Sequence, residues 1–92
     1  MSYRFEWDPK KAASNLKDHG VSFDEATTVF GDTFAMNMPD PDHSAEEQRF
    51  LVLGMSGASR LVVVSYAERP PQTRIISARL TTGRERRKYE ND

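Results

Sequence analysis

Three runs rich in β-branched and aromatic residues follow one another in the second half of the chain: QRFLVLGM (48–55), RLVVVSYAER (60–69) and TRIISARL (73–80). The segment SGAS separates the first two runs, and Pro70 and Pro71 form the turn between the second and third. Strands joined by such short connections pair antiparallel. The stretch from Leu61 to Val64 is apolar throughout, which is typical of a central strand covered on both faces. The runs therefore predict a three-stranded meander.

The first third of the chain predicts a strand and two short helices. YRFEW (3–7) alternates aromatic and charged residues and reads as the strand. The helix boundaries are marked by Asp8 and Pro9 before the first helix, Gly20 after it, the capping-box pair Ser22 and Glu25 at the start of the second, and Gly31 at its end. Each of these residue types is favoured at the position it occupies. Two helices back to back predict a helical hairpin.

Two further elements complete the expected fold. Residues 33–38 (TFAMNM) predict a weak strand, and the capping-box pair Thr82 and Glu85 predicts a C-terminal helix over residues 83–90. The order strand, helix, helix, strands, helix predicts an α+β fold. In it the N-terminal strand and two-helix hairpin pack on an antiparallel sheet. With 92 residues, the chain is expected to form a single domain over residues 1–92.

Composition excludes several classes of protein. The chain has no cysteine, which rules out a disulfide framework, thiolate zinc sites and cysteine nucleophiles. No apolar run approaches the roughly 18–20 residues of a membrane span, and the N-terminus lacks the apolar core of a signal peptide. We therefore expect a cytoplasmic protein that does not enter the membrane.

The formal net charge of −1 conceals a division of charge along the chain. Residues 1–59 hold five basic and ten acidic side chains, whereas residues 60–92 hold eight basic and four acidic ones. Seven of those eight are arginines, whose planar fork suits phosphate better than the lysine ammonium does. The division suggests a polyanion on one face and a basic protein partner on the other, with a solvated surface as the plainer alternative.

Three blocks of sequence carry a resemblance to a known family: FEWDPKKAASNLKDHGVSFDEA, then PDPDH followed by RFLVLGMS, then RIISARLTTGRERRKYE. In this order they resemble the BrnT family, the toxins of type II toxin–antitoxin systems. The resemblance implies a RelE-like fold and a metal-independent endoribonuclease that inhibits translation and uses no cofactor. It also implies two partners, an RNA substrate and a BrnA-like ribbon-helix-helix antitoxin. DNA operator contact would occur only through the complex with that antitoxin.

The residues themselves point to the same chemistry. Cleaving RNA without metal needs an activated 2′-hydroxyl, positive charge on the developing phosphorane and a proton for the leaving 5′-oxygen. Arginine stays protonated and supplies the charge. In residues 73–80 the period of two places Arg74 and Arg79 on opposite faces of the strand. We predict Arg79 as a catalytic residue and Arg74 as a second candidate that could equally be an ordinary edge charge.

The predicted last helix carries a stripe of cations. Arg84, Arg87 and Lys88 stand at i, i+3 and i+4, while Glu85 and Tyr89 share another face. The stripe predicts RNA-backbone contact or antitoxin docking, between which the sequence does not choose, and a solvated helix is the plainer alternative. Tyr89 could stack on a base.

Acid–base candidates are few. His43 follows Asp40 and Asp42 in a loop, and histidine suits proton transfer near neutrality. Glu68 ends the central strand and could act as a base if that end opens into the site. The group Asp40, Asp42 and His43 could also hold a metal, but nothing else clusters with it, and we predict no metal site.

Two functions from different classes remain open at this stage. The first is an endoribonuclease whose arginine-rich surface binds RNA and stabilises the transition state of cleavage. The second is a cleavage-incompetent module that binds the antitoxin and contributes to operator autoregulation. Harm on expression without antitoxin, together with RNA cleavage, would favour the first.

Overall fold

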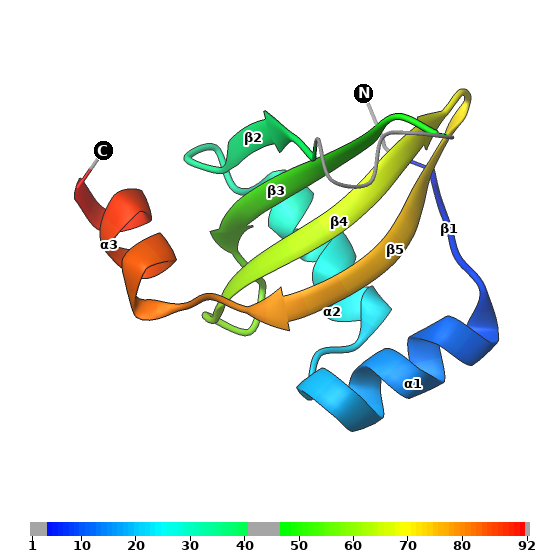
Figure 1. Cartoon of the computed structure of the whole chain (residues 1–92), viewed down its shortest axis with the longest axis horizontal. Helices are drawn as coiled ribbons and strands as arrows, with labels where there is room; N and C mark the ends of the chain where they lie inside the picture. Colours follow the sequence, from blue (N-terminus) through cyan, green and yellow to red (C-terminus); the bar gives the residue numbers. More distant parts are fainter. Residues whose placement is uncertain (1–3, 41–46, 92) are drawn as a thin grey trace.

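The computed structural model describes residues 4–40 and 47–91. The elements in chain order are β1 (Phe5–Glu6), α1 (Pro9–His19), α2 (Phe23–Thr28), a 3-10 turn η1 (Val29–Gly31), β2 (Met36–Pro39), β3 (Arg49–Met55), β4 (Leu61–Arg69), β5 (Gln72–Leu80) and α3 (Gly83–Asn91). The strands form one sheet in the order β1-β5-β4-β3-β2. Figure 1 shows α1 and α2 on one side of this sheet and α3 standing apart, beyond the ends of the central strands. The α+β prediction is confirmed.

The predicted meander is present as β3, β4 and β5, with the apolar β4 at the centre of the sheet. Strand β2 extends the antiparallel part by pairing with β3. The prediction of a purely antiparallel sheet was wrong, because β1 pairs parallel with β5. The helical hairpin carries the chain away from β1, so the later strand β5 can lie beside it in the same direction. The sheet is therefore mixed.

The predicted helix boundaries are used, although one of them only in part. Asp8 accepts a hydrogen bond from the Lys10 backbone N–H at 2.9 Å, and Gly20 adopts a left-handed conformation with φ of 70° after α1. Ser22 accepts from the backbone N–H of Glu25 at 3.0 Å. The Glu25 carboxylate does not return to Ser22 but binds Arg60, which joins the start of α2 to the β3–β4 turn.

A buried asparagine fastens α1 to the sheet. The Asn15 amide nitrogen donates to the backbone oxygens of Val21 (2.9 Å) and Ala78 (2.7 Å), and the Ala78 N–H donates to the Asn15 side-chain oxygen at 3.1 Å. Asn15 therefore makes both hydrogen bonds with Ala78 that a neighbouring strand would make. Strand β1 pairs with only two residues of β5, Thr73 and Arg74. Further along the same edge of β5, at Ala78, the Asn15 side chain takes the place of a neighbouring strand.

The sheet has two different faces. We call the face packed against α1, α2 and η1 the inner face; its buried side chains are Val52, Val62, Val64, Tyr66, Ile75 and Ala78. They meet a second apolar set from the hairpin, which comprises Val21, Phe23, Ala26 and Val29. We call the opposite face the outer face. Burial of this apolar set is the main stabilising contribution, at roughly 25 cal/mol per Å² removed from water.

A β-bulge in β5 changes which residues reach the outer face. The pairs on either side of the irregularity are Ser65 with Ser77 and Tyr66 with Ile75. Ile76 has no partner of its own, so the alternation of faces slips by one residue there. Ile75 and Ala78 consequently share the inner face although they are three apart. Arg74 and Arg79, five apart, share the outer face, and the prediction that they lie on opposite faces was wrong.

Candidate functional site

A shallow hollow of about 280 Å³ lies on the outer face across the meander. Its lining residues are Asp40, Arg49, Leu51, Ser65, Ile76, Ser77 and Arg79. The lining combines two guanidinium groups, one carboxylate and two hydroxyls with the apolar side chains of Leu51 and Ile76. Figure 1 shows that none of the described helices covers this face of the sheet.

Arg79 is held at the edge of this hollow by the last helix. Its two terminal nitrogens donate to the two carboxylate oxygens of Glu85 at 2.8 and 2.9 Å, and one of them also donates to the Leu80 backbone oxygen at 3.2 Å. Glu85 in turn accepts from the Thr82 N–H at 2.9 Å and so completes the predicted capping box. These bonds use three of the five N–H donors of the guanidinium, so Glu85 orients Arg79 without saturating it.

The Arg79–Glu85 pair is strongly coupled. The hydrogen bonds from Arg79, aided by those from Thr82, lower the pKa of Glu85 to about 2 against the opposing effect of its burial. The same bidentate pairing raises the pKa of Arg79. Both side chains are therefore charged at any pH near neutrality.

Two other strand arginines of the outer face, Arg74 and Arg69, are also paired with carboxylates. Arg74 lies 3.4 Å from Glu6 of β1, and Arg69 donates to Glu47 at 2.7 Å. The count of charges over residues 60–92 overlooked these two carboxylates, because they come from the acidic part of the sequence before residue 60. The strand arginines of this segment are consequently less positive in effect than the count suggests.

The cations of α3 differ from those of the strands. Arg84, Arg87 and Lys88 are exposed, and none of them makes an ion pair with any residue in 4–40 or 47–91. Arg86 forms the i,i+4 pair with Glu90 at 3.6 Å that the spacing indicates. Among the basic residues from 60 to 88, those without an ion pair to a described residue therefore all lie on α3.

Tyr89 attaches α3 to the body of the protein. Its hydroxyl donates to Asp32 at 2.6 Å, and Asp32 also accepts the backbone N–H groups of Met55 (2.7 Å) and Phe34 (2.9 Å). Burial would raise the pKa of Asp32, but these hydrogen bonds outweigh it and lower the pKa. The bond to Asp32 and burial raise the pKa of Tyr89 to about 12. Tyr89 is thus a neutral phenol that points inward, not along the cation stripe.

Of the predicted acid–base residues, Glu68 is described by the structure, and it is not brought to Arg79. Glu68 follows Tyr66 on the inner side of β4, opposite Thr73, whereas Arg79 lies opposite Val63 on the outer side. The structure therefore separates Glu68 from Arg79 by the thickness of the sheet. His43 and Asp42 lie outside the described residues. Asp40 is buried and lines the outer hollow.

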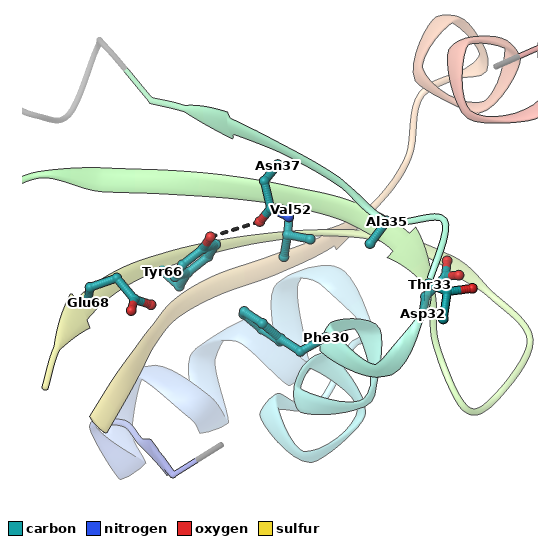
Figure 2. Close-up of a pocket in the computed structure, with 8 residues that line it drawn as sticks. All are labelled: Phe30, Asp32, Thr33, Ala35, Asn37, Val52, Tyr66 and Glu68. Carbon is teal, nitrogen blue, oxygen red and sulfur yellow. Dashed lines mark hydrogen bonds between the residues drawn. The ribbon is translucent and has the colours of Figure 1, made fainter. Parts of the chain in front are cut away.

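A second, larger hollow of about 410 Å³ lies on the inner side under strand β2. We call it the inner groove; Figure 2 shows its lining residues, which are Phe30, Asp32, Thr33, Ala35, Asn37, Val52, Tyr66 and Glu68. The Tyr66 hydroxyl donates to the Asn37 side-chain oxygen at 2.8 Å across it. No basic side chain lines the groove, in contrast to the outer hollow.

Comparison with known proteins identifies the family. The sequence model of a family described as the ribonuclease toxin BrnT of type II toxin–antitoxin systems matches residues 7–85. The chain belongs to the BrnT family. A crystal structure of the Brucella abortus ribonuclease toxin BrnT resembles this chain with a TM-score of 0.69 at 19% sequence identity, over 88% of this chain and 99% of that one. A search against curated proteins found no significant match.

In the described part of this BrnT chain, no helix is both long and apolar enough to cross a membrane. Among residues 4–40 and 47–91 there is also no group of three acidic or histidine side chains arranged to hold a metal ion. The candidate metal group of the sequence includes Asp42 and His43, which fall outside these ranges.

Sequence reasoning missed three features of this BrnT site. It took Glu85 as a helix cap alone, although an acidic residue six positions after a strand arginine could have suggested the pair. It did not foresee the carboxylates of Glu6 and Glu47, since nothing local links them to the arginines that they bind. The inner groove had no signal either, because its walls come from three separate stretches of the sequence: residues 30–37, Val52 and residues 66–68.

Proposed function

We propose that this protein is a RelE-like, metal-independent endoribonuclease that inhibits translation by cleaving RNA and is neutralised by a ribbon-helix-helix antitoxin. The RNA lies along the outer face, with the scissile phosphate at Arg79 and the flanking backbone on Arg84, Arg87 and Lys88. The observation that carries the proposal is the pairing of Arg79 with Glu85, which orients Arg79 with two N–H donors to spare and joins it to the helix that carries Arg84, Arg87 and Lys88.

The reaction expected from this arrangement is attack by the neighbouring 2′-oxygen on phosphorus. A 2′-O–P bond forms, the P–O5′ bond breaks, and the products are a 2′,3′-cyclic phosphate and a 5′-hydroxyl. Arg79 would stabilise the extra negative charge on the phosphoryl oxygens in the transition state. The proton leaves the 2′-hydroxyl and another is given to the 5′-oxygen. His43 remains a candidate for proton transfer, and so does a water molecule in the open hollow.

The residues predicted from sequence contribute unequally to this proposal. Arg74 lies on the same face as Arg79 because of the bulge and would contact a flanking phosphate after exchanging with Glu6. Tyr89 supports α3 through Asp32 and would not stack on a base in this arrangement. Glu68 is left out of the catalytic set because it faces the other side of the sheet.

The proposal is tested by incubating the purified protein with RNA in excess EDTA and identifying the ends produced. We expect unchanged cleavage and 2′,3′-cyclic phosphate ends, because the charge on phosphate is supplied by arginine. Loss of cleavage in EDTA, with recovery on adding back one divalent ion, would contradict metal independence. It would also direct attention to Asp40, Asp42 and His43.

One observation favours the second function, a cleavage-incompetent module that binds antitoxin and supports operator autoregulation. Arg79 is already paired with a carboxylate, and no histidine lies beside it among the described residues. A protein with this arrangement could bind RNA without cleaving it. Expression without antitoxin separates the two functions: growth arrest with RNA cleavage supports the enzyme, whereas harmless expression supports the module.

A further inference from the structure

The inner groove has the chemistry of a site for a cationic side chain. Figure 2 shows Glu68 at one end of the groove, Asp32 near the other, and the rings of Phe30 and Tyr66 between them. The two rings meet edge to face with centroids 5.0 Å apart, and Phe50 stacks on Tyr66 at 5.6 Å. The aromatic wall is thus fixed by its neighbours before anything binds.

The two carboxylates of the inner groove have different roles. Asp32 already accepts hydrogen bonds from Met55, Phe34 and Tyr89, so it is committed to holding α3 and the β3 end. Glu68 is exposed, and within residues 4–40 and 47–91 its one hydrogen bond is a long one of 3.3 Å from the Thr73 hydroxyl. Glu68 is therefore the carboxylate able to receive a ligand.

We propose that the inner groove receives an arginine side chain of the antitoxin, with its guanidinium paired to Glu68 and lying against Tyr66 or Phe30. Guanidinium groups favour both contacts, since they bind carboxylates with two parallel hydrogen bonds and stack on aromatic faces. A hollow of about 410 Å³ lies near the lower end of the range of pockets that bind small molecules, and it has room for a guanidinium group. This inference rests on the proposed function to the extent that the protein has an antitoxin.

The sign of the charge selects this occupant over a nucleotide. A nucleobase would fit the aromatic wall, but its phosphates would face Glu68 and Asp32 with no basic side chain in the lining to offset them. The groove is built from β2, β3, β4 and the segment after α2, and so mostly from the acidic part of the chain. It opens on the side of the sheet opposite Arg79, so RNA and the antitoxin arginine have separate surfaces.

The test uses a blocked tripeptide, acetyl-Gly-Arg-Gly-amide, titrated into the isotope-labelled full-length protein and followed by NMR. The matched probe replaces arginine by citrulline, which has nearly the same shape and no charge, and a third titration uses cytidine monophosphate. Glu68→Gln removes the charge on the groove, whereas Glu90→Gln removes an exposed charge on α3 as a control. Thermal unfolding of each variant establishes that it is folded.

We expect the arginine peptide to shift resonances of Asn37, Val52 and Tyr66 with weak affinity, and the citrulline peptide to bind at least fivefold less tightly. Glu68→Gln should weaken arginine binding by a similar factor, and Glu90→Gln should leave it unchanged. Equal binding of the two peptides, or shifts confined to other surfaces, would overturn the proposal. Binding of cytidine monophosphate in the groove in place of the peptide would instead make it a nucleobase site. The experiment measures peptide binding and does not depend on RNA cleavage, so it can be interpreted even if the ribonuclease proposal fails.

Discussion

Arg79 combines a positive charge, a fixed orientation and partial exposure to solvent. Its guanidinium is held by Glu85 through a bidentate pair, which fixes the plane of the fork. Fixed donors stabilise a transition state better than mobile ones, because they need no reorganisation when charge develops. Glu85 therefore preorganises Arg79, because it fixes the direction of the guanidinium N–H donors before a substrate binds.

We predict that Arg79→Ala lowers the rate of RNA cleavage by about 10²–10³-fold while the protein stays folded, because one charge contact to the transition state is lost. Arg79→Lys should fail to restore the rate, since an ammonium cannot reproduce the bidentate geometry. Cleavage rates of purified variants check this, with Arg86→Ala as the control on an exposed surface pair. A parental rate in Arg79→Ala would make this arginine structural.

The pairing of Glu85 also predicts a pH dependence of stability. Because the pKa of Glu85 falls to about 2 in the folded protein, its contribution is present above the ordinary carboxyl pKa of about 4.3 and is lost as pH falls towards 2. At pH 7, Glu85→Gln should lower the free energy of unfolding by about 1 kcal/mol, a modest value because the pair is partly exposed.

Urea unfolding at pH 7 and pH 3 measures this effect. The difference between the parent and Glu85→Gln should be smaller at pH 3 than at pH 7. Glu90→Gln is the matched control, since Glu90 lies on the same helix in an exposed pair with Arg86. A difference that does not change with pH would show that the carboxylate charge adds nothing to folding.

At the scale of elements, α3 is attached by few contacts. None of its residues is buried, and within residues 4–40 and 47–91 two of its side chains hydrogen-bond to side chains of other elements: Glu85 to Arg79 and Tyr89 to Asp32. A helix of this kind opens locally at a lower free-energy cost than the core of the sheet. Its two attachments decide how often the cation stripe is held in place.

Tyr89→Phe should therefore loosen α3 without unfolding the sheet, because it removes the hydrogen bond to Asp32 and keeps the ring. We expect amide hydrogen exchange across residues 83–91 to become several-fold faster, with exchange in β4 unchanged. Lys88→Ala, at the neighbouring exposed position, is the control. Equal exchange in Tyr89→Phe and the parent would mean that the Glu85 attachment alone suffices.

The helices and strands were predicted better than the face of the sheet to which each strand residue points. Helix boundaries follow from local signals, and Asp8, Gly20 and Ser22 act where the sequence places them. Strand faces depend on register, which one unpaired residue in β5 shifts, and a bulge leaves no mark in the run TRIISARL. In the candidate site, the sequence named Arg74 and Arg79, and their role in catalysis stays a prediction. The carboxylates Glu6 and Glu47 were not foreseen, because they come from distant segments that only folding brings to Arg74 and Arg69.

At the scale of the whole molecule, positive and negative side chains lie on different surfaces although their numbers nearly balance. The exposed side of α3 carries three cations without an ion pair among the described residues, while the inner groove carries two carboxylates and no cation in its lining. Binding of a polyanion depends on local potential, so a chain with a net charge of −1 can still hold RNA.

The salt dependence of RNA binding measures how much α3 contributes. The double variant Arg84→Ala with Arg87→Ala should bind single-stranded RNA more weakly and lose about 1.4 units from the log–log salt slope, allowing roughly 0.7 per phosphate contact. Lys10→Ala with Lys11→Ala removes two exposed charges from α1 as the control. If the α3 double variant keeps the parental slope, its stripe serves the antitoxin or the solvent.

The closure of the sheet edge by Asn15 has a consequence for how the protein behaves in a crowded solution. Open strand edges invite other chains to add to a sheet and lead to aggregation. Here β1 pairs over two residues, α1 fills the next part of that edge with an amide, and the opposite edge is a four-residue strand ending in Pro39. A sheet with so little exposed edge offers few places for copies to join. The chain is thereby suited to remain dispersed at times when no partner is present to cover it.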